Sequence, residues 1–97
     1  MFSARVINHS NTRLLNICDS DLLGKTFTSG SFSIKISESY YGERMIKKDE
    51  AKDLLDKCDN INMVGNQIIS LSVSLGIGSK NGIKEIDGIP FLIVFKV

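Results

Sequence analysis

Histidine, cysteine, proline and tryptophan are scarce or missing in this chain. It has one histidine, two cysteines, one proline and no tryptophan. A structural zinc site needs about four ligands, so one histidine and two widely separated cysteines do not supply one. Cys18 and Cys58 lack a Cys-x-x-Cys partner and are expected to be buried, reduced thiols that pack as small hydrophobic groups. The sequence therefore predicts no metal and no cofactor.

Long apolar runs and a dominant charge are also missing. No apolar stretch approaches the ~18 residues that a membrane helix requires, and the N-terminus has no signal-peptide pattern, so we expect a soluble, cytoplasmic protein. Lys and Arg number 12 against 11 Asp and Glu, a net charge of +1. Binding to nucleic acid would therefore need a local basic patch. The length of 97 residues predicts a single domain over residues 1–97.

Motifs for catalysis or phosphate binding are absent. The stretch from Gly76 to Gly82 lacks the Gly-Lys-Ser/Thr ending of a P-loop. His9 falls in a predicted turn with no nucleophile motif around it. Asp19 and Asp21 are better explained as caps of a short helical turn over residues 19–24. The sequence therefore predicts no catalytic residue.

The N-terminal half predicts strands. Residues 2–8 and 12–18 are strand-like runs joined by turn-forming residues, and they predict a hairpin. Residues 31–36 alternate strictly between apolar and polar side chains, which is typical of a half-buried strand with a polar face toward solvent or a partner.

The middle of the chain predicts one helix clearly and leaves a second segment open. Over residues 48–58, apolar side chains recur at the spacing of one buried helical stripe: Ala51, Leu54, Leu55 and Cys58. Residues 61–76 fit two structures. Positions 69–75 alternate as in a strand, whereas Val64, Ile68, Leu71 and Leu75 form a helical stripe ended by Gly76.

The C-terminal segment predicts a second hairpin. Asp87-Gly88 is a strong turn signal between a short strand at 83–86 and an apolar run at 91–95. Pro90 cannot donate to a ladder, so it should lie at a strand start or edge. The continuous apolar run predicts a central strand covered on both faces. Residues 76–82 are expected to be a flexible, exposed loop.

The segment Tyr40-Tyr41-Gly42-Glu43-Arg44 has three interpretations. One tyrosine can pack on the core while the other groups are surface residues. A tyrosine can instead stack on an RNA base while cations meet phosphates. The segment can also be a protein-binding patch, because Tyr and Arg are favoured at interfaces. The candidate RNA-binding or partner-binding residues are Lys25, Lys35, Tyr40, Tyr41, Arg44, Lys47 and Lys48.

Several short motifs in order resemble the archaeal family called domain of unknown function 424. They are Cys18-Asp19, the run from Asp21 to Phe27, the run from Ser37 to Glu43, Asn62-Met63-Val64-Gly65, Leu75-Gly76-Ile77 and Asp87-Gly88-Ile89-Pro90. Family members carry alanine and glutamate where this chain has Ser70, Ser72 and Ser74, so the resemblance favours a helix over 64–75, weakened by the serines. It also implies archaeal origin and a gene context near translation factors.

These observations predict a single α+β domain. An N-terminal hairpin, the strand at 31–36 and a C-terminal hairpin would form a mainly antiparallel sheet, with two helices on one face. The expected function is a non-catalytic accessory of translation that contacts ribosomal RNA, tRNA or a ribonucleoprotein. The alternatives are a protein-interaction module for a translation factor and a small hydrolase or transferase, which would need a cleft and shifted pKa values at Glu43, Asp19 or His9.

Overall fold

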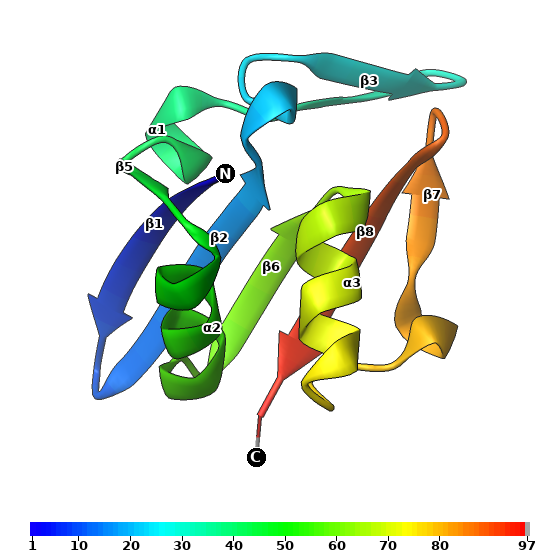
Figure 1. The fold of residues 1–97 in the computed structure, drawn as a ribbon. Helices are drawn as coiled ribbons and strands as arrows, with labels where there is room; N and C mark the ends of the chain where they lie inside the picture. The colour runs from blue at the N-terminus through cyan, green and yellow to red at the C-terminus, as the bar shows by residue number, and fades with distance from the viewer. Residues whose placement is uncertain (97) are drawn as a thin grey trace.

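A computed structural model describes residues 1–96 of the chain. Its strands are β1 (Phe2–His9), β2 (Thr12–Asp19), β3 (Thr26–Ser29), β4 (Phe32–Lys35), β5 (Arg44–Ile46), β6 (Asn60–Val64), β7 (Lys84–Ile86) and β8 (Ile89–Phe95). Its helices are α1 (Glu38–Tyr41), α2 (Lys48–Lys57) and α3 (Asn66–Ser74), with 3₁₀ turns at Ser20–Leu22 and Lys80–Gly82 (Figure 1).

Over residues 1–96, six strands form the main sheet in the order β5-β1-β2-β6-β8-β7. All neighbours pair antiparallel except β2 and β6, which are parallel and are connected through the intervening elements, including α2. The predicted fold class, an α+β domain with a mainly antiparallel sheet and two helices, is confirmed.

Both predicted hairpins are present, and each has a two-residue turn. Ser10 and Asn11 have φ values of 49° and 66°, and Asp87 and Gly88 have 55° and 77°. Left-handed conformations at both turn positions match the right-handed twist of the flanking strands. Pro90 is the second residue of β8, at the strand start where it was expected.

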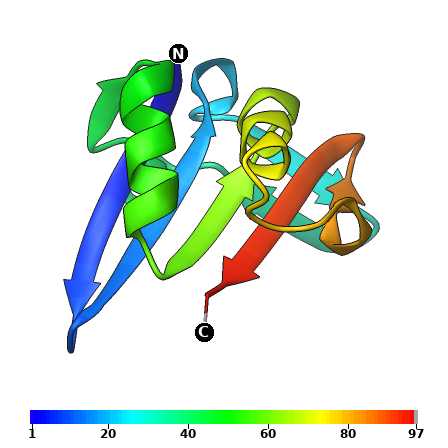
Figure 2. The ribbon, with the colours of Figure 1, turned by 60° about the horizontal axis from the view of Figure 1, so that its bottom comes forward.

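Helices α2 and α3 cover one face of the sheet (Figure 2). In the stripe predicted for α2, Ala51 and Leu55 are buried and Leu54 is half-buried, while the buried Cys58 follows the last helical residue. The larger core between helices and sheet includes inward-facing residues of the central strands, among them Leu15, Ile17, Ile61, Met63 and Leu92.

A smaller core lies on the opposite face of the sheet, at the end where β2 and β6 finish. It joins Cys18 and Val64 of the sheet to Phe27, Ile36 and Tyr41 from the β3–β4 hairpin and α1. β3 and β4 form a separate two-stranded sheet that covers this end of the second face, whereas Ile93 and Phe95 farther along β8 are exposed.

The prediction that the strand at 31–36 joins the main sheet is therefore wrong. The strand is seen as β4, but it pairs with β3 and not with the main sheet. Its alternation is real, yet burial rises along it: Phe32 is exposed, Ile34 is half-buried and Ile36 is fully buried. Alternation reports a two-faced strand and does not reveal which strand will pair with it.

Residues 60–76 combine a strand and a helix. β6 ends at Val64, and α3 runs over Asn66–Ser74, so a helix is present but begins later than residue 64. Of the predicted helical stripe, Ile68 and Leu71 are buried in α3, whereas Val64 belongs to the strand and Leu75 is exposed. Gly76 follows the C-cap residue Leu75 as the predicted C′ glycine, with a φ of 76°. Its N–H donates to the Val73 carbonyl, and the Ile77 N–H donates to the Ser72 carbonyl, both at 3.0 Å.

The last strand differs from the prediction in its burial. β8 lies between β6 and β7. On the side of the sheet away from α2 and α3, however, its side chains are covered only near the start of the strand. Ile93 is 59% exposed and Phe95 is 71% exposed. The expected cover on both faces is therefore wrong, because the β3–β4 hairpin does not reach this end of the sheet.

The segment 76–82 is mostly exposed, as predicted, and its flexibility stays a prediction. Among residues 1–96, no helix has the length and apolar character needed to cross a membrane.

Candidate functional site on the open face of the sheet

Helix α1 is held against the open face, the side of the main sheet away from α2 and α3. The Ser3 hydroxyl donates to the Tyr41 carbonyl at 2.8 Å, and the Arg5 guanidinium donates to the Ser39 carbonyl. Both donors belong to β1, whose side chains alternate between the two faces. The helix is thus positioned by the sheet, and the tyrosines with it.

The two tyrosines have different environments. Tyr41 is 5% exposed, and its hydroxyl accepts a hydrogen bond from Asn62 Nδ2 at 3.0 Å. Burial raises the pKa of Tyr41 to about 12, so its hydroxyl stays protonated. Tyr40 is 55% exposed, and its ring centre lies 5.8 Å from that of Tyr41. Tyr41 is therefore structural, whereas Tyr40 presents a supported ring to solvent.

Tyr40 stands between two adjoining hollows. The first, of about 340 Å³, is lined by Ile34, Lys35, Tyr40, Tyr41, Asn62, Lys84, Ile86, Phe91 and Ile93. The second, of about 240 Å³, shares Tyr40, Asn62 and Ile93 with it and adds, among others, Ile7, Leu14, Asn16, Asn60 and Phe95. Because they share three residues, we treat them as one depression, the open-face groove.

The first hollow of the groove combines apolar side chains with positive charge. Lys35 of β4 and Lys84 of β7 are exposed and line the first hollow. Among the described residues, no Asp or Glu lines either hollow. The groove therefore suits a ligand with a flat or apolar body and a negative group.

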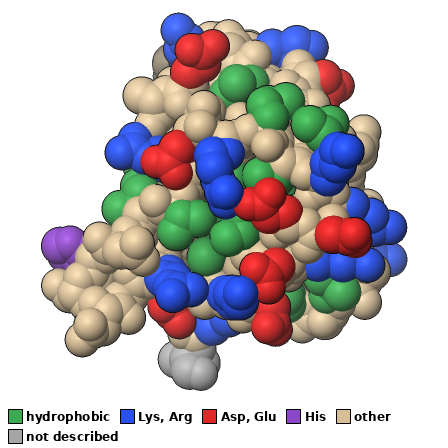
Figure 3. All heavy atoms as spheres, turned by 60° about the vertical axis from the view of Figure 1, so that its left-hand side comes forward, with side chains coloured by type: hydrophobic (Ala, Val, Ile, Leu, Met, Phe, Trp, Pro, Cys, Tyr) green, Lys and Arg blue, Asp and Glu red, His purple; other side chains and the backbone are tan. Residues whose placement is uncertain are grey.

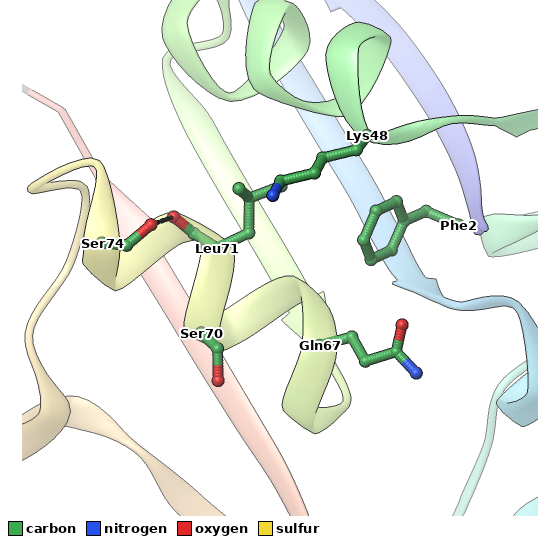
Figure 4. Close-up of a pocket in the computed structure, with 6 residues that line it drawn as sticks. All are labelled: Phe2, Lys48, Gln67, Ser70, Leu71 and Ser74. Atoms are coloured by element: carbon green, nitrogen blue, oxygen red, sulfur yellow. Dashed lines mark hydrogen bonds between the residues drawn. The ribbon is translucent and has the colours of Figure 1, made fainter.

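The structure brings only some of the predicted site residues together. Lys35, Tyr40 and Tyr41 lie at the groove, but Arg44 forms an ion pair with Glu50 of α2 at 2.7 Å. Lys48 lines another hollow, between α2 and α3 (Figure 4). Lys25 and Lys47 are exposed and line neither hollow of the groove.

Figure 4 shows Lys48 extending from the start of α2 toward α3, beside Phe2 of β1. Gln67, Ser70 and Ser74 complete the polar lining of this hollow. Charges are mixed on the side of the molecule that carries α2 and the β5 edge: Figure 3 shows Lys and Arg interspersed with Asp and Glu. That side has no continuous basic surface.

Sequence reasoning missed Lys84, Asn62 and Ile93. The sequence does indicate that Asn62 lies on the polar face of a strand, since Asn60-Ile61-Asn62-Met63 alternates between polar and apolar residues. Ile93 could not be predicted as a site residue, because all residues from 91 to 95 are apolar and the sequence does not show which face of the strand will be left open.

Asp19 has a structural role that differs from the predicted one. Its side chain does not cap the adjacent 3₁₀ turn. Instead, its carboxylate accepts from the backbone N–H groups of Gln67 and Ile68, at 2.9 and 2.8 Å, and caps α3. His9 and Glu43 are exposed and line neither hollow of the groove. Within residues 1–96, no cluster of three His, Cys, Asp or Glu side chains could hold a metal ion.

Comparison with known proteins gives a family and a fold. No curated protein matches the sequence. A crystal structure of an uncharacterized conserved protein from Methanopyrus kandleri superposes with a TM-score of 0.80 at 23% identity, covering 99% of this chain and 93% of that one. At this identity the likeness establishes the shared fold. The family model described as "Protein of unknown function (DUF424)" matches residues 7–97. The chain therefore belongs to the DUF424 family.

Proposed function

We propose that this protein is a non-catalytic accessory of translation that contacts single-stranded RNA, alone or in a ribonucleoprotein, through the open-face groove. One observation carries the proposal. The exposed ring of Tyr40 lies beside the apolar side chains and two lysines of the first hollow, and neither hollow has an Asp or Glu in its lining among residues 1–96.

The chemistry of the groove matches that of an unpaired nucleotide. A base can stack on the Tyr40 ring, a contact worth roughly 1–3 kcal/mol per base. Lys35 and Lys84 can meet neighbouring phosphates and release counterions. Double-stranded RNA would not fit this arrangement, because its bases are already stacked. The placement beside translation rests on the family resemblance.

A titration of fluorescently labelled single-stranded RNA, followed by anisotropy, tests the proposal. Tyr40→Ala should weaken binding roughly tenfold because it removes the stacking surface. Lys84→Ala should weaken binding and reduce its salt dependence by about one unit of slope. Ribosomal RNA and tRNA serve as natural competitors.

Lys48→Ala is the matched control. It removes the same charge, but from the helix-covered side of the sheet. Binding that ignores salt, or that falls equally in Lys48→Ala and Lys84→Ala, would contradict the proposal.

A protein-interaction module for a translation factor is the second candidate. The exposed side chains of Ile93 and Phe95, 59% and 71% accessible, favour it. A pull-down from nuclease-treated lysate separates the two functions. A translation factor that is retained without RNA and lost in Phe95→Ser would support this candidate; loss of all partners after nuclease treatment would contradict it.

A further inference from the structure

Three asparagines lie together on the floor of the second hollow. Asn16 of β2 is opposite Asn62 of β6 in the parallel pair, and Asn60 precedes Asn62 by two residues on the same face. Two residues along a strand span about 7 Å. The amides thus follow the groove for a distance that one extended nucleotide step can bridge.

These amides retain hydrogen-bonding capacity. The side chain of Asn62 donates one hydrogen from Nδ2 to the Tyr41 hydroxyl, and its Oδ1 accepts no hydrogen bond within residues 1–96. In the same residues, no hydrogen bond within the protein engages the side chain of Asn16 or Asn60. Asn16 is only 8% exposed. Among the described residues, every fully buried side-chain N or O atom has a hydrogen-bond partner, so the unpartnered amide atoms of Asn16 are not fully buried. The remaining exposure of Asn16 therefore includes its amide, which faces the groove.

The two hollows differ in what they can recognise. Lysines line only the first hollow, whereas the lining of the second holds amides and apolar side chains without a lysine. A phosphate is favoured near Lys35 and Lys84, and an uncharged group is favoured over Asn16 and Asn60. An amide presents one donor side and one acceptor side, the pattern of a base edge.

We propose that the second hollow reads the identity of a base, with Asn16 and Asn60 as the specificity-determining residues, while Tyr40 stacks and the lysines hold phosphate. This inference rests on the proposed function. It makes the protein a sequence-selective RNA binder and not a general backbone-tracking one, because amides at base edges distinguish bases whereas rings and lysines do not.

Binding of labelled eight-nucleotide strands of A, of U and of C at one salt concentration tests the inference. The wild-type protein should prefer one strand over the weakest by at least about fivefold, the low end of discrimination by an amide–base pair. Asn60→Ala and Asn16→Ala should each reduce that preference toward equality and leave the salt slope unchanged. Lys84→Ala should lower the slope and weaken all three strands alike.

Asn81→Ala, in the exposed 3₁₀ turn outside the groove, is the control and should bind as wild type does. Thermal melting verifies that each variant folds. If Asn16→Ala unfolds, Asn60→Ala still tests the inference, because Asn60 is only half-buried. Binding that depends on Tyr40 but treats the three strands equally would overturn this inference alone, as would an equal loss on all strands in Asn60→Ala. Absence of RNA binding in the wild type would overturn the proposed function as well.

Discussion

The Asp19 carboxylate and Gly65 lie in direct contact where β2 ends and α3 begins. Gly65 has a φ of 116°, and a Cβ built there would lie 2.4 Å from the Asp19 carboxyl carbon. The same carboxylate satisfies two of the N–H groups at the start of α3, which the helix itself leaves unpaired. Glycine is required here for its conformation and for the space that the cap occupies.

Gly65→Ala should lower the free energy of unfolding by about 2–4 kcal/mol, because it adds backbone strain and displaces the cap. Urea denaturation measures the loss. Gly24→Ala is a matched control: Gly24 has a φ of 86°, and a Cβ added there would meet nothing within 4 Å. Equal losses in the two variants would show that the collision with Asp19 is unimportant.

Asp19 should also give stability a particular pH dependence. Burial is the main effect and raises the pKa of its carboxyl above the ordinary 3.8. The hydrogen bonds from the two N–H groups lower the pKa and offset part of that rise. The folded state therefore retains the proton to higher pH than the unfolded chain. The contribution of Asp19 to the free energy of unfolding is largest below pH 3.8 and declines as the pH rises through the folded-state pKa.

Denaturation of wild type and Asp19→Asn from pH 7 to pH 4 tests this dependence. The wild type should gain stability relative to the variant as the pH falls, because titrating groups that do not interact with Asp19 cancel in the difference. A difference that is constant, or that shrinks toward pH 4, would contradict the raised pKa.

At the scale of elements, α3 is a serine-rich helix whose stability depends on its contacts. Ser72 is fully buried, and its hydroxyl donates to the Ile77 carbonyl at 2.6 Å, beyond the helix end. Ser70 is exposed on the same helix. Tertiary packing of Ile68 and Ile69 offsets the weak helix propensity of serine.

Two alanine substitutions in α3 should therefore have opposite effects. Ser70→Ala should stabilise the protein by about 0.5 kcal/mol through helix propensity. Ser72→Ala should destabilise it by about 1 kcal/mol or more, because the Ile77 carbonyl loses its donor. Chemical denaturation of both variants measures the pair; stabilisation by both would mean that the Ser72 bond contributes nothing.

At the scale of the whole molecule, one sheet supports two cores. Cys18 belongs to the smaller core on the open face, and Cys58 belongs to the larger core under the helices. The two residues are 0% and 1% exposed. Desolvation raises the pKa of Cys18 to about 12 and raises that of Cys58 as well, so reactive thiolate is scarce in the folded state.

Both thiols should therefore react with an alkylating reagent only when the molecule unfolds. We expect alkylation at least roughly a thousandfold slower than in urea, given ordinary domain stability. Mass spectrometry of each cysteine peptide measures the two rates. Equal rates would indicate that the cores open together; faster reaction at Cys18 would show that the β3–β4 hairpin opens by itself.

The sequence determined the features whose causes are local. Turn residues specify the hairpins at Ser10-Asn11 and Asp87-Gly88, and the apolar stripe of α2 and the glycine stop of α3 are visible within one or two helical turns. Lys35 and Tyr40 of the candidate site were also predicted, because an aromatic pair with nearby cations is a local pattern.

Only the tertiary structure decided which strands pair, which face stays open and what the side chains meet there. The pairing of β6 with β2 and β8, the cap that Asp19 provides to α3 and the approach of Lys84 to Tyr40 all join residues distant in the chain. The same holds for the burial of Tyr41 and the exposure of Tyr40. Two adjacent residues of the same type can have different environments, because the environment depends on surfaces that folding brings together. Local periodicity in the sequence does not reveal those surfaces.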